Sequence, residues 1–375
     1  MKSPICDMLG IEFPLIAFTH CRDVVVEVSK AGGMGVLGAA GYDAHTLDIE
    51  LRWIDEHIGG KPYGVDLIAP TSMAVSDDDT PETILAKVPQ EHRDFACNLL
   101  ARYGIDTADV YTNQRVGGGG FLTNKRAASI IDVAFSHPIK LIANALGVPP
   151  RYMLDMGKAR GVAVAALVGA KEHAVKQVEA GVDILVVAGT EAGGHTGEVS
   201  TLVLVPEVCD AVKGRNVAVL AAGGIVTGRQ MAACMAMGAH GAWTGSMWLT
   251  TTEAETSLVV KEKYVQASSR QTVRSKYRTG KYSRQLRSPW TDAWESEDAP
   301  EALPMPLMSL VSEPALRKVT KLAEGGHAGA RQLATYFVGQ GVGLMNSIQD
   351  TRTVMREFME DYLAAVERLS GTIAD

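Results

Sequence analysis

Short apolar runs alternate with helical patterns along this chain, from about residue 14 to residue 244 of its 375 residues. Most of these runs are continuously apolar, as expected of parallel strands that are buried on both faces. Helical stretches such as Arg22–Ala31 and Lys171–Ala180 lie between them. The alternation predicts an α/β fold, a closed (β/α)8 TIM barrel. Its eight predicted strands are Pro14–Phe18, Met34–Leu37, Tyr63–Ile68, Ile139–Ala143, Val162–Leu167, Val182–Val187, Val217–Ala221 and Gly241–Thr244.

Two segments fall outside this alternation, so we assign residues 1–68 and 125–255 to the barrel. Residues 69–124 form a helical insertion after the third strand, with a helical stretch from Pro81 to about Tyr103. Because it leaves the carboxyl end of a strand, it is a candidate lid over the catalytic rim, the alternative being a peripheral insertion. Residues 256–375 are predicted to form a C-terminal helical extension. Its last helix carries one apolar stripe, for docking on the barrel or on a partner subunit.

The charge balance and the cysteine pattern exclude several classes of protein. Thirty-six Lys and Arg against 43 Asp and Glu give a net charge of −7, which argues against a general nucleic-acid binder. The five cysteines are scattered and form no C-x-x-C pair, so neither a disulfide framework nor a metal site is indicated. No apolar run approaches the roughly 20 residues that a membrane span needs. We therefore expect a cytoplasmic protein without a nucleic-acid or membrane partner.

Glycine-containing turns follow the seventh and eighth predicted strands, where a barrel of this kind holds a phosphate. The two turns are Ala222-Gly223-Gly224 and Thr244-Gly245-Ser246. Glycine lets backbone N–H groups approach an anion, and the N-terminus of a following helix adds a positive partial charge. The G-x-G-x-x-G match at Gly33–Gly38 is a different case, because it follows a helix and runs into a strand. This order is the reverse of a dinucleotide fingerprint, and we interpret the match as a helix end and a strand.

The most specific local feature is the loop after the sixth predicted strand. It reads Gly189-Thr190-Glu191-Ala192-Gly193-Gly194-His195-Thr196-Gly197. The flanking glycines would let such a loop lie flat against a planar ring. An imidazole with its ordinary pKa of about 6.5 exchanges protons near neutral pH. His195 is therefore the candidate catalytic base, the alternative being a loop histidine tied to a carbonyl.

These motifs resemble those of the nitronate monooxygenase (2-nitropropane dioxygenase-like) family of FMN-dependent TIM-barrel oxidoreductases. The resemblance covers most of the predicted barrel. It rests on Glu191–Gly197, Thr201–Val208, Ala221–Ile225 and Gly238–Ala242, with further matches at Phe13–Ile16, Ala31–Gly38, Pro62–Asp66 and Gly339–Gly343.

The resemblance implies FMN as the cofactor and a role for each matching position. His195 would be the catalytic base, and the loops after the seventh and eighth strands would hold the FMN phosphate. Residues 17–19 would lie against the flavin ring, and Asp66 would face the ribityl or phosphate side. The implied cofactor-binding residues are Ala17, Phe18, Thr19, Asp66, Ala192, Gly193, Gly194, Ala222, Gly223, Gly224, Thr244, Gly245 and Ser246.

Departures from the family pattern leave the substrate open. Ile16–Cys21 differs from the usual first-strand motif, and Asp66 stands where Asn is usual. The leading expectation is a nitronate monooxygenase that oxidises nitronates or nitroalkanes with O2. One alternative is an NAD(P)H-dependent flavin reductase of a quinone or an enoyl thioester, and another is a non-catalytic ligand-binding barrel. A small-molecule substrate is expected, with O2 or NAD(P)H as co-substrate, and a homodimer is a candidate assembly.

Two further features of the sequence each allow more than one interpretation. Seven basic residues lie between Arg270 and Arg287, with acidic residues following them. They could form a solvated or intersubunit face, a site for an anionic substrate such as an acyl-CoA phosphate, or a nucleic-acid contact. His20 and Cys21 follow the first strand and could meet the substrate, the alternative being a loop histidine and a buried thiol.

Overall fold

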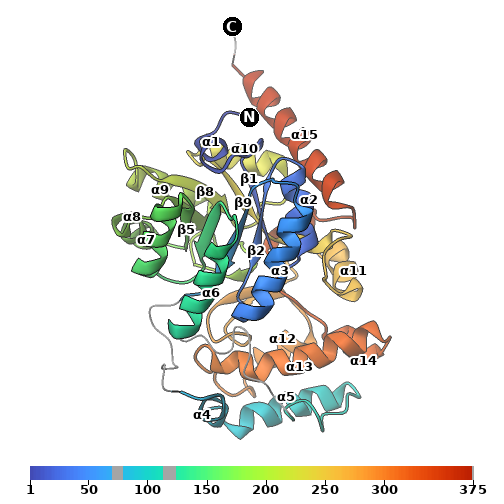
Figure 1. Cartoon of the computed structure of the whole chain (residues 1–375). Coiled ribbons are helices and arrows are strands. Elements are labelled where there is room, and N and C mark those ends of the chain that lie inside the picture. The colour runs from blue at the N-terminus through green and yellow to red at the C-terminus, as the bar shows by residue number, and fades with distance from the viewer. Residues whose placement is uncertain (70–78, 113–123, 374–375) are drawn as a thin grey trace.

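The structure, a computed structural model, describes residues 1–69, 79–112 and 124–373. Eight parallel strands close into a barrel in the order β1-β2-β3-β4-β5-β6-β8-β9, surrounded by helices (Figure 1). The predicted (β/α)8 barrel is therefore confirmed, and each predicted strand agrees with an observed one within two residues at either end. The barrel strands are β1 Leu15–Thr19, β2 Met34–Gly38, β3 Tyr63–Leu67, β4 Leu141–Asn144, β5 Ala163–Val168, β6 Ile184–Ala188, β8 Ala218–Ala222 and β9 Gly241–Thr244.

Successive side chains of each strand point alternately into the barrel and outward to the helices. In β1, Ile16 belongs to the apolar cluster that fills the barrel, whereas Leu15 and Ala17 belong to the cluster between strands and helices. Helix α1 contributes Ile5 and Leu9 to the interior cluster and so closes the end of the barrel at which the strands begin. The opposite end, where the strands finish, is left for a site.

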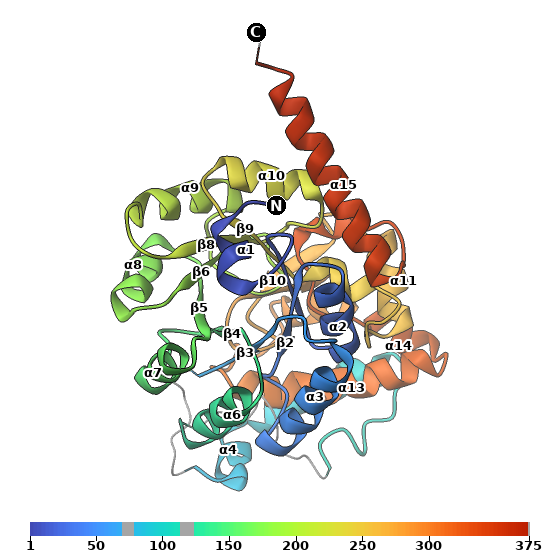
Figure 2. The ribbon, with the colours of Figure 1, turned by 45° about the horizontal axis from the view of Figure 1, so that its top comes forward.

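Helices cover the outer face of the barrel between successive strands (Figure 2). The G-x-G-x-x-G match lies in β2, as interpreted from the sequence, and a Cβ at Gly35 would sit 2.4 Å from the Cα of Val25 in α2. Its glycine thus allows close contact between a strand and a helix. The helices along the barrel are α1 Pro4–Leu9, α2 Arg22–Lys30, α3 Ala44–His57, α6 Asn124–Ser136, α7 Arg151–Arg160, α8 Lys171–Ala180, α9 Thr201–Ala211 and α10 Gly228–Ala236.

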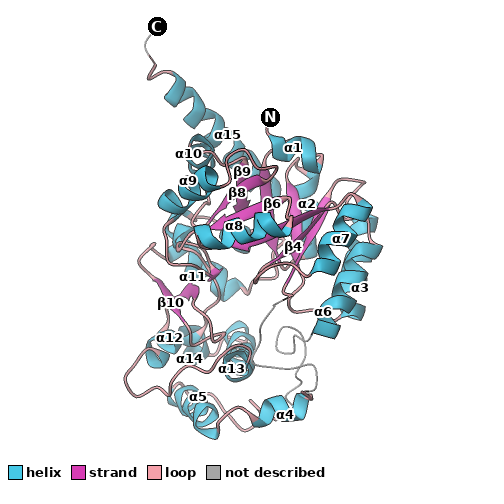
Figure 3. Cartoon of the chain, turned by 90° about the vertical axis from the view of Figure 1, so that its left-hand side faces the viewer, coloured by secondary structure: helices cyan, strands magenta, loops and turns pink. Residues whose placement is uncertain are grey.

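The insertion and the extension together build a second apolar core beside the barrel. Leu99 of the insertion shares this core with Trp290, Trp294 and Val311 of the extension. Figure 3 shows α4 and α5 lying on the far side of α13 from the barrel. The described helices of the predicted lid therefore pack on the extension, and residues 70–78 and 113–123 lie outside the described chain. The helices of the insertion are α4 Pro81–Ala86 and α5 Gln90–Arg102. The helices that follow β9 are η2 Ser246–Thr250, α11 Leu258–Gln266, α12 Pro289–Trp294, α13 Leu307–Glu324, α14 Ala328–Leu333, η3 Gln340–Leu344 and α15 Thr351–Ser370.

The extension also contains strands, which the sequence analysis did not predict. Strands β10 Thr272–Ser275 and β11 Ser283–Leu286 form an antiparallel hairpin, and β11 pairs with β7 Gly194–His195. The hairpin lies within the basic stretch, and parts of that stretch are tied into the chain. Arg278 is buried and pairs with Glu313 at 2.9 Å, and Arg284 donates to the carbonyl of Thr190 at 3.0 Å.

The last helix returns to the barrel and docks against α10 and α2 (Figure 2). Its Met355 and Phe358 are buried, and Asp361 pairs with Arg229 of α10 at 2.7 Å. The first part of the apolar stripe therefore docks on the barrel, one of the two predicted outcomes, whereas Leu363 and Val366 of the same stripe are exposed. Across residues 1–69, 79–112 and 124–373, none of the helices combines the length and the apolar character that crossing a membrane requires.

The close approach of α15 to α10 depends on a glycine. A Cβ added at Gly228 would lie 1.9 Å from the carbonyl oxygen of Phe358, so Gly228→Ala should push the two helices apart. We expect the substitution to lower the free energy of unfolding by about 1–3 kcal/mol, measured by urea denaturation. Gly325→Ala is the matched control, because its Cβ would meet only an ordinary contact at 3.4 Å. Equal stability of the two variants would contradict this packing.

Candidate functional site

A cavity of about 940 Å³ opens at the carboxyl ends of the barrel strands. Its wall is formed by the strand ends and by residues of the extension, among them Thr279, Tyr336 and Phe337. No described residue of α4 or α5 lines it. Of the residues implied by the family resemblance, all but Ala17 line this one cavity. The side chain of Ala17 points outward to the helix layer, so only its backbone is directed to the barrel side.

Two turns after β8 and β9 form one end of the cavity. Gly223 and Gly224 have φ values of 100° and 71°, a left-handed conformation that favours glycine. The Gln230 side chain fixes this turn, because it accepts from the Val226 amide at 2.9 Å and donates to the Gly224 carbonyl at 2.8 Å. Helix α10 begins at Gly228, shortly after this turn, so the partial positive charge of its N-terminus lies behind this end of the cavity.

Ser246 completes this end of the cavity. Its Oγ accepts a hydrogen bond from the Gly339 amide at 2.8 Å, which leaves the hydroxyl proton available for an anion. Together with the turn after β8, the hydroxyl forms a glycine-lined end of the cavity that offers hydrogen-bond donors. The Glu191 side chain packs against Gly224, and its carboxylate is bonded to the Thr201 hydroxyl. This arrangement suits a phosphate group.

The loop after β6 is held in place by contacts with the extension. A Cβ at Gly193 would lie 2.8 Å from the amide nitrogen of Gly339. The two backbone segments can therefore come this close only because both positions are glycine. The Glu191 carboxylate accepts hydrogen bonds from the amide and the hydroxyl of Thr201, each at 2.9 Å. The motif at Gly339–Gly343 thus serves the loop that carries His195, although nearly 150 residues of chain separate them.

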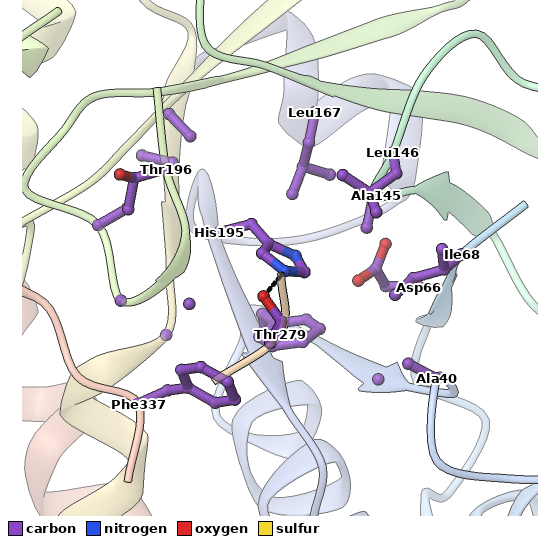
Figure 4. A pocket seen from close by; sticks show the side chains of 18 of the residues that line it. Ala40, Asp66, Ile68, Ala145, Leu146, Leu167, His195, Thr196, Thr279 and Phe337 are labelled. Carbon is purple, nitrogen blue, oxygen red and sulfur yellow. Dashed lines mark hydrogen bonds between the residues drawn. The ribbon is translucent and has the colours of Figure 1, made fainter. Parts of the chain in front are cut away.

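His195 lies on the cavity wall, where β7 pairs with β11. Its Nε2 is 2.9 Å from the Thr279 hydroxyl, which itself donates to the Lys281 carbonyl at 3.1 Å (Figure 4). Since that bond uses the only hydroxyl proton of Thr279, Thr279 accepts from His195 Nε2–H. The imidazole is therefore protonated on Nε2 and carries its lone pair on Nδ1, the state in which it can accept a proton.

Burial, and to a smaller extent the nearby charge of Lys281, lower the pKa of His195 to about 4. The imidazole is consequently neutral at physiological pH. Because this pKa is below the unfolded value of about 6.5, the unfolded chain binds the proton more tightly. The titration of His195 therefore lowers the free energy of unfolding as the pH falls from about 6.5 toward 4.

Asp66 lies at the other end of the cavity. The closed strand order places three strands between β3 and β8 in either direction, so Asp66 is across the barrel mouth from Gly223. It therefore does not face the turns after β8 and β9, and the expectation that it faces the ribityl or phosphate side stays a prediction. Its side chain is 5% exposed, and burial raises its pKa well above the ordinary value.

Phe18, Thr19 and His20 form the wall beside Asp66. The Phe18 ring stacks on Trp243 at 6.4 Å between centroids, and His20 meets its edge at 5.1 Å. The His20 Nδ1 is bonded to the Gly38 carbonyl at 3.0 Å, whereas Cys21 does not line the cavity and donates to the Glu253 carbonyl. This apolar and aromatic end suits a planar ring.

Sequence reasoning missed Thr279 and Phe337, and it named Lys281 only as one residue of the basic stretch. All three come from the extension, and no local motif in the sequence connects them with the barrel loops. Among the described residues, no three His, Cys, Asp or Glu side chains gather in a way that could hold a metal ion.

Comparisons with known proteins assign the chain to a family. A family model described as Nitronate monooxygenase matches residues 2–361. The chain is 48% identical over 376 residues to a Mycobacterium tuberculosis protein named Putative monooxygenase Rv1533, with both chains covered completely. It is 27% identical over 300 residues to a dehydrogenase of an octahydroindene carboxyl-CoA from the same organism, covering 79% of this chain and 69% of the relative.

Among solved structures, nitroalkane oxidase from Streptomyces ansochromogenes is similar with a TM-score of 0.79. The match covers 97% of this chain and 99% of the other at 22% sequence identity, and it shows the shared barrel fold.

The hydrogen bond between Thr279 and His195 generates a prediction about the tautomer. Thr279→Val removes the acceptor of the Nε2 proton. The ratio of the Nε2–H tautomer of His195 to its Nδ1–H tautomer should therefore fall by about fivefold, which corresponds to about 1 kcal/mol. Thr279→Ser keeps the acceptor and should retain the original tautomer. Nitrogen-15 chemical shifts of His195 measure the ratio, and a proton on Nδ1 in the unmodified protein would contradict the assignment.

Proposed function

The chain belongs to the nitronate monooxygenase family, whose members are flavin-dependent oxidoreductases, and from this premise we propose that it is an FMN-dependent enzyme that oxidises nitronates or nitroalkanes with dioxygen. The observation that carries the proposal is the neutral His195, with its Nδ1 free, in a cavity that the glycine turns after β8 and β9 also line. Membership of an oxidoreductase family argues against a barrel that has lost catalysis.

The residues present fit FMN in one orientation. The phosphate would lie on the turns after β8 and β9, with Gly223, Gly224 and Ser246 around it and the N-terminus of α10 behind it. The flavin ring would extend from these turns over the mouth, past Phe18 and Thr19 of β1, the strand next to β9. Ala192, Gly193 and Gly194 would lie along the ring, and Ala222, Thr244 and Gly245 beside the phosphate and ribityl chain.

His195 would perform the proton transfer at its Nδ1. With a nitroalkane, the imidazole would remove the proton on the carbon beside the nitro group, which yields the nitronate anion. The bound flavin would supply the redox chemistry, taking electrons from the nitronate and passing them to dioxygen. The low pKa keeps the imidazole free to accept a proton, and the negative nitronate formed beside it would stabilise the resulting imidazolium. A nitronate substrate would not need this step.

A second candidate function is the NAD(P)H-dependent reduction of an acyl thioester or a quinone. It is favoured by Lys176, Lys281 and Arg317, which line the exposed side of the cavity and form no ion pair with another described residue. Three free cations near a cavity suit the phosphates of a nucleotide-bearing substrate. The relative that acts on a carboxyl-CoA is consistent with this alternative.

Replacement of the base separates the proton transfer from the redox step. His195→Asn should keep the flavin and its yellow colour but lower kcat/KM for nitroethane by at least about 100-fold, the usual contribution of a general base. Turnover of ethylnitronate, which is already deprotonated, should fall much less. Steady-state oxygen consumption with both substrates makes the comparison, and unimpaired turnover of nitroethane would eliminate the proposed role.

Anaerobic mixing distinguishes the two candidate functions. Ethylnitronate should bleach the flavin absorbance of the purified protein under argon, whereas NADH and NADPH should not do so on the time scale of turnover. Stopped-flow absorbance measures both. Rapid bleaching by a reduced nicotinamide, with none by ethylnitronate, would favour the reductase.

A further inference from the structure

Asp66 is a buried acid that the proposed mechanism does not yet use. It is the last inward-facing residue of β3, and its side chain is 5% exposed. Its Oδ1 is completely buried and has no hydrogen-bond partner among the described residues. A polar atom without a partner at a cavity wall is costly to maintain, so its presence points to a partner that the protein chain itself does not supply.

The surroundings of Asp66 offer no compensating charge. Figure 4 shows its carboxyl group beside the apolar side chains of Ile68, Ala145 and Leu146 and directed toward the ring of His195. The described salt bridges include none to Asp66. Asn144 on the neighbouring strand is already engaged, since its side chain accepts from the Ala69 amide at 2.9 Å and donates to the Leu146 carbonyl at 3.1 Å.

The titratable groups of the cavity wall do not change this balance. They are, besides Asp66, His20 after β1, His173 and Lys176 on α8, His195 on β7, Arg274 on β10, Lys281 and Tyr282 before β11, Glu313 and Arg317 on α13, and Tyr336. None lies within ion-pair distance of the Asp66 carboxyl among the described residues. An ionised carboxylate here would be an unpaired buried charge, whereas the neutral acid has one O–H group to donate. Burial raises the pKa of Asp66 well above its ordinary value, in the same direction.

We propose that Asp66 is a neutral carboxylic acid that donates a hydrogen bond to an oxygen of the bound nitro or nitronate group, opposite the imidazole of His195. The inference rests on the proposed function. Asp66 cannot serve the phosphate of the cofactor, because β3 lies across the mouth from the turns after β8 and β9. A substrate between Asp66 and His195 meets a donor on one side and a base on the other.

This arrangement matches the charge movement of the reaction. When the carbon proton moves to His195 Nδ1, the electron pair of the C–H bond forms the C=N bond and negative charge moves onto the nitro oxygens. The Asp66 O–H stabilises these oxygens without transferring its proton. An ionised Asp66 would repel the same anion, so the burial that keeps the acid neutral also selects for an oxyanionic substrate. The family's usual Asn would donate in the same way, which explains how an acid is tolerated at this position.

The test uses the flavin-loaded protein and the nitrate ion, a planar, inert stand-in for a nitronate. Infrared spectroscopy at pH 7 should show the carbonyl band of a protonated carboxylic acid, absent from Asp66→Asn. The band should persist in the matched control Asp183→Asn, whose carboxyl lies at the other end of the barrel and accepts from the Val164 amide. The dissociation constant of nitrate, followed by the flavin absorbance, should be similar in Asp66→Asn and weaker by about 10- to 100-fold in Asp66→Leu.

Two results would overturn the proposal. One is the absence of the acid band at pH 7, and the other is an unchanged nitrate affinity in Asp66→Leu. A shifted flavin absorbance in the Asp66 variants with unchanged nitrate affinity would place the donor on the cofactor and likewise overturn it. Neither measurement needs turnover, so an intact band and nitrate response without oxidation of ethylnitronate would count against the proposed function alone.

Discussion

The closure of eight buried parallel strands is the constraint on which the rest of this structure depends. Such a barrel has a filled interior and helices over its outer face, so only the ends of its strands are free for chemistry. Closure also sets which ends face one another. It places Asp66, at the end of β3, across the mouth from Gly223 after β8, on the wall of the same cavity.

The extension is part of the site rather than an appendage to it. It supplies the strand that pairs with β7, the hydroxyl that fixes the tautomer of His195, and the backbone of Gly339 against Gly193. The extension in turn is stabilised by its own core, which it shares with α4 and α5. The orientation of one imidazole therefore depends on packing that extends from the barrel to the insertion.

The predictable part of this fold is the part with a local signal. All eight barrel strands were predicted because most are continuous apolar runs that alternate with helical patterns, and the loop of His195 was found because its glycines adjoin a histidine. The hairpin of β10 and β11 was missed because arginines obscure its alternation, and Thr279 was missed because its role arises only from a long-range contact. Strand alternation could have shown that Ala17 points outward, and the order of strands could have placed Asp66 across the mouth from the turns after β8.

The central claim is that one cavity holds FMN with its phosphate on the turns after β8 and β9 and its ring between Phe18 and His195. A crystal structure of the protein with FMN bound tests it most directly. The account predicts the phosphate within hydrogen-bond distance of the Ser246 hydroxyl and the Gly224 turn, with His195 Nδ1 facing the space above the ring. A phosphate beside Lys176 or Lys281, with the ring on the opposite side of the mouth, would contradict it.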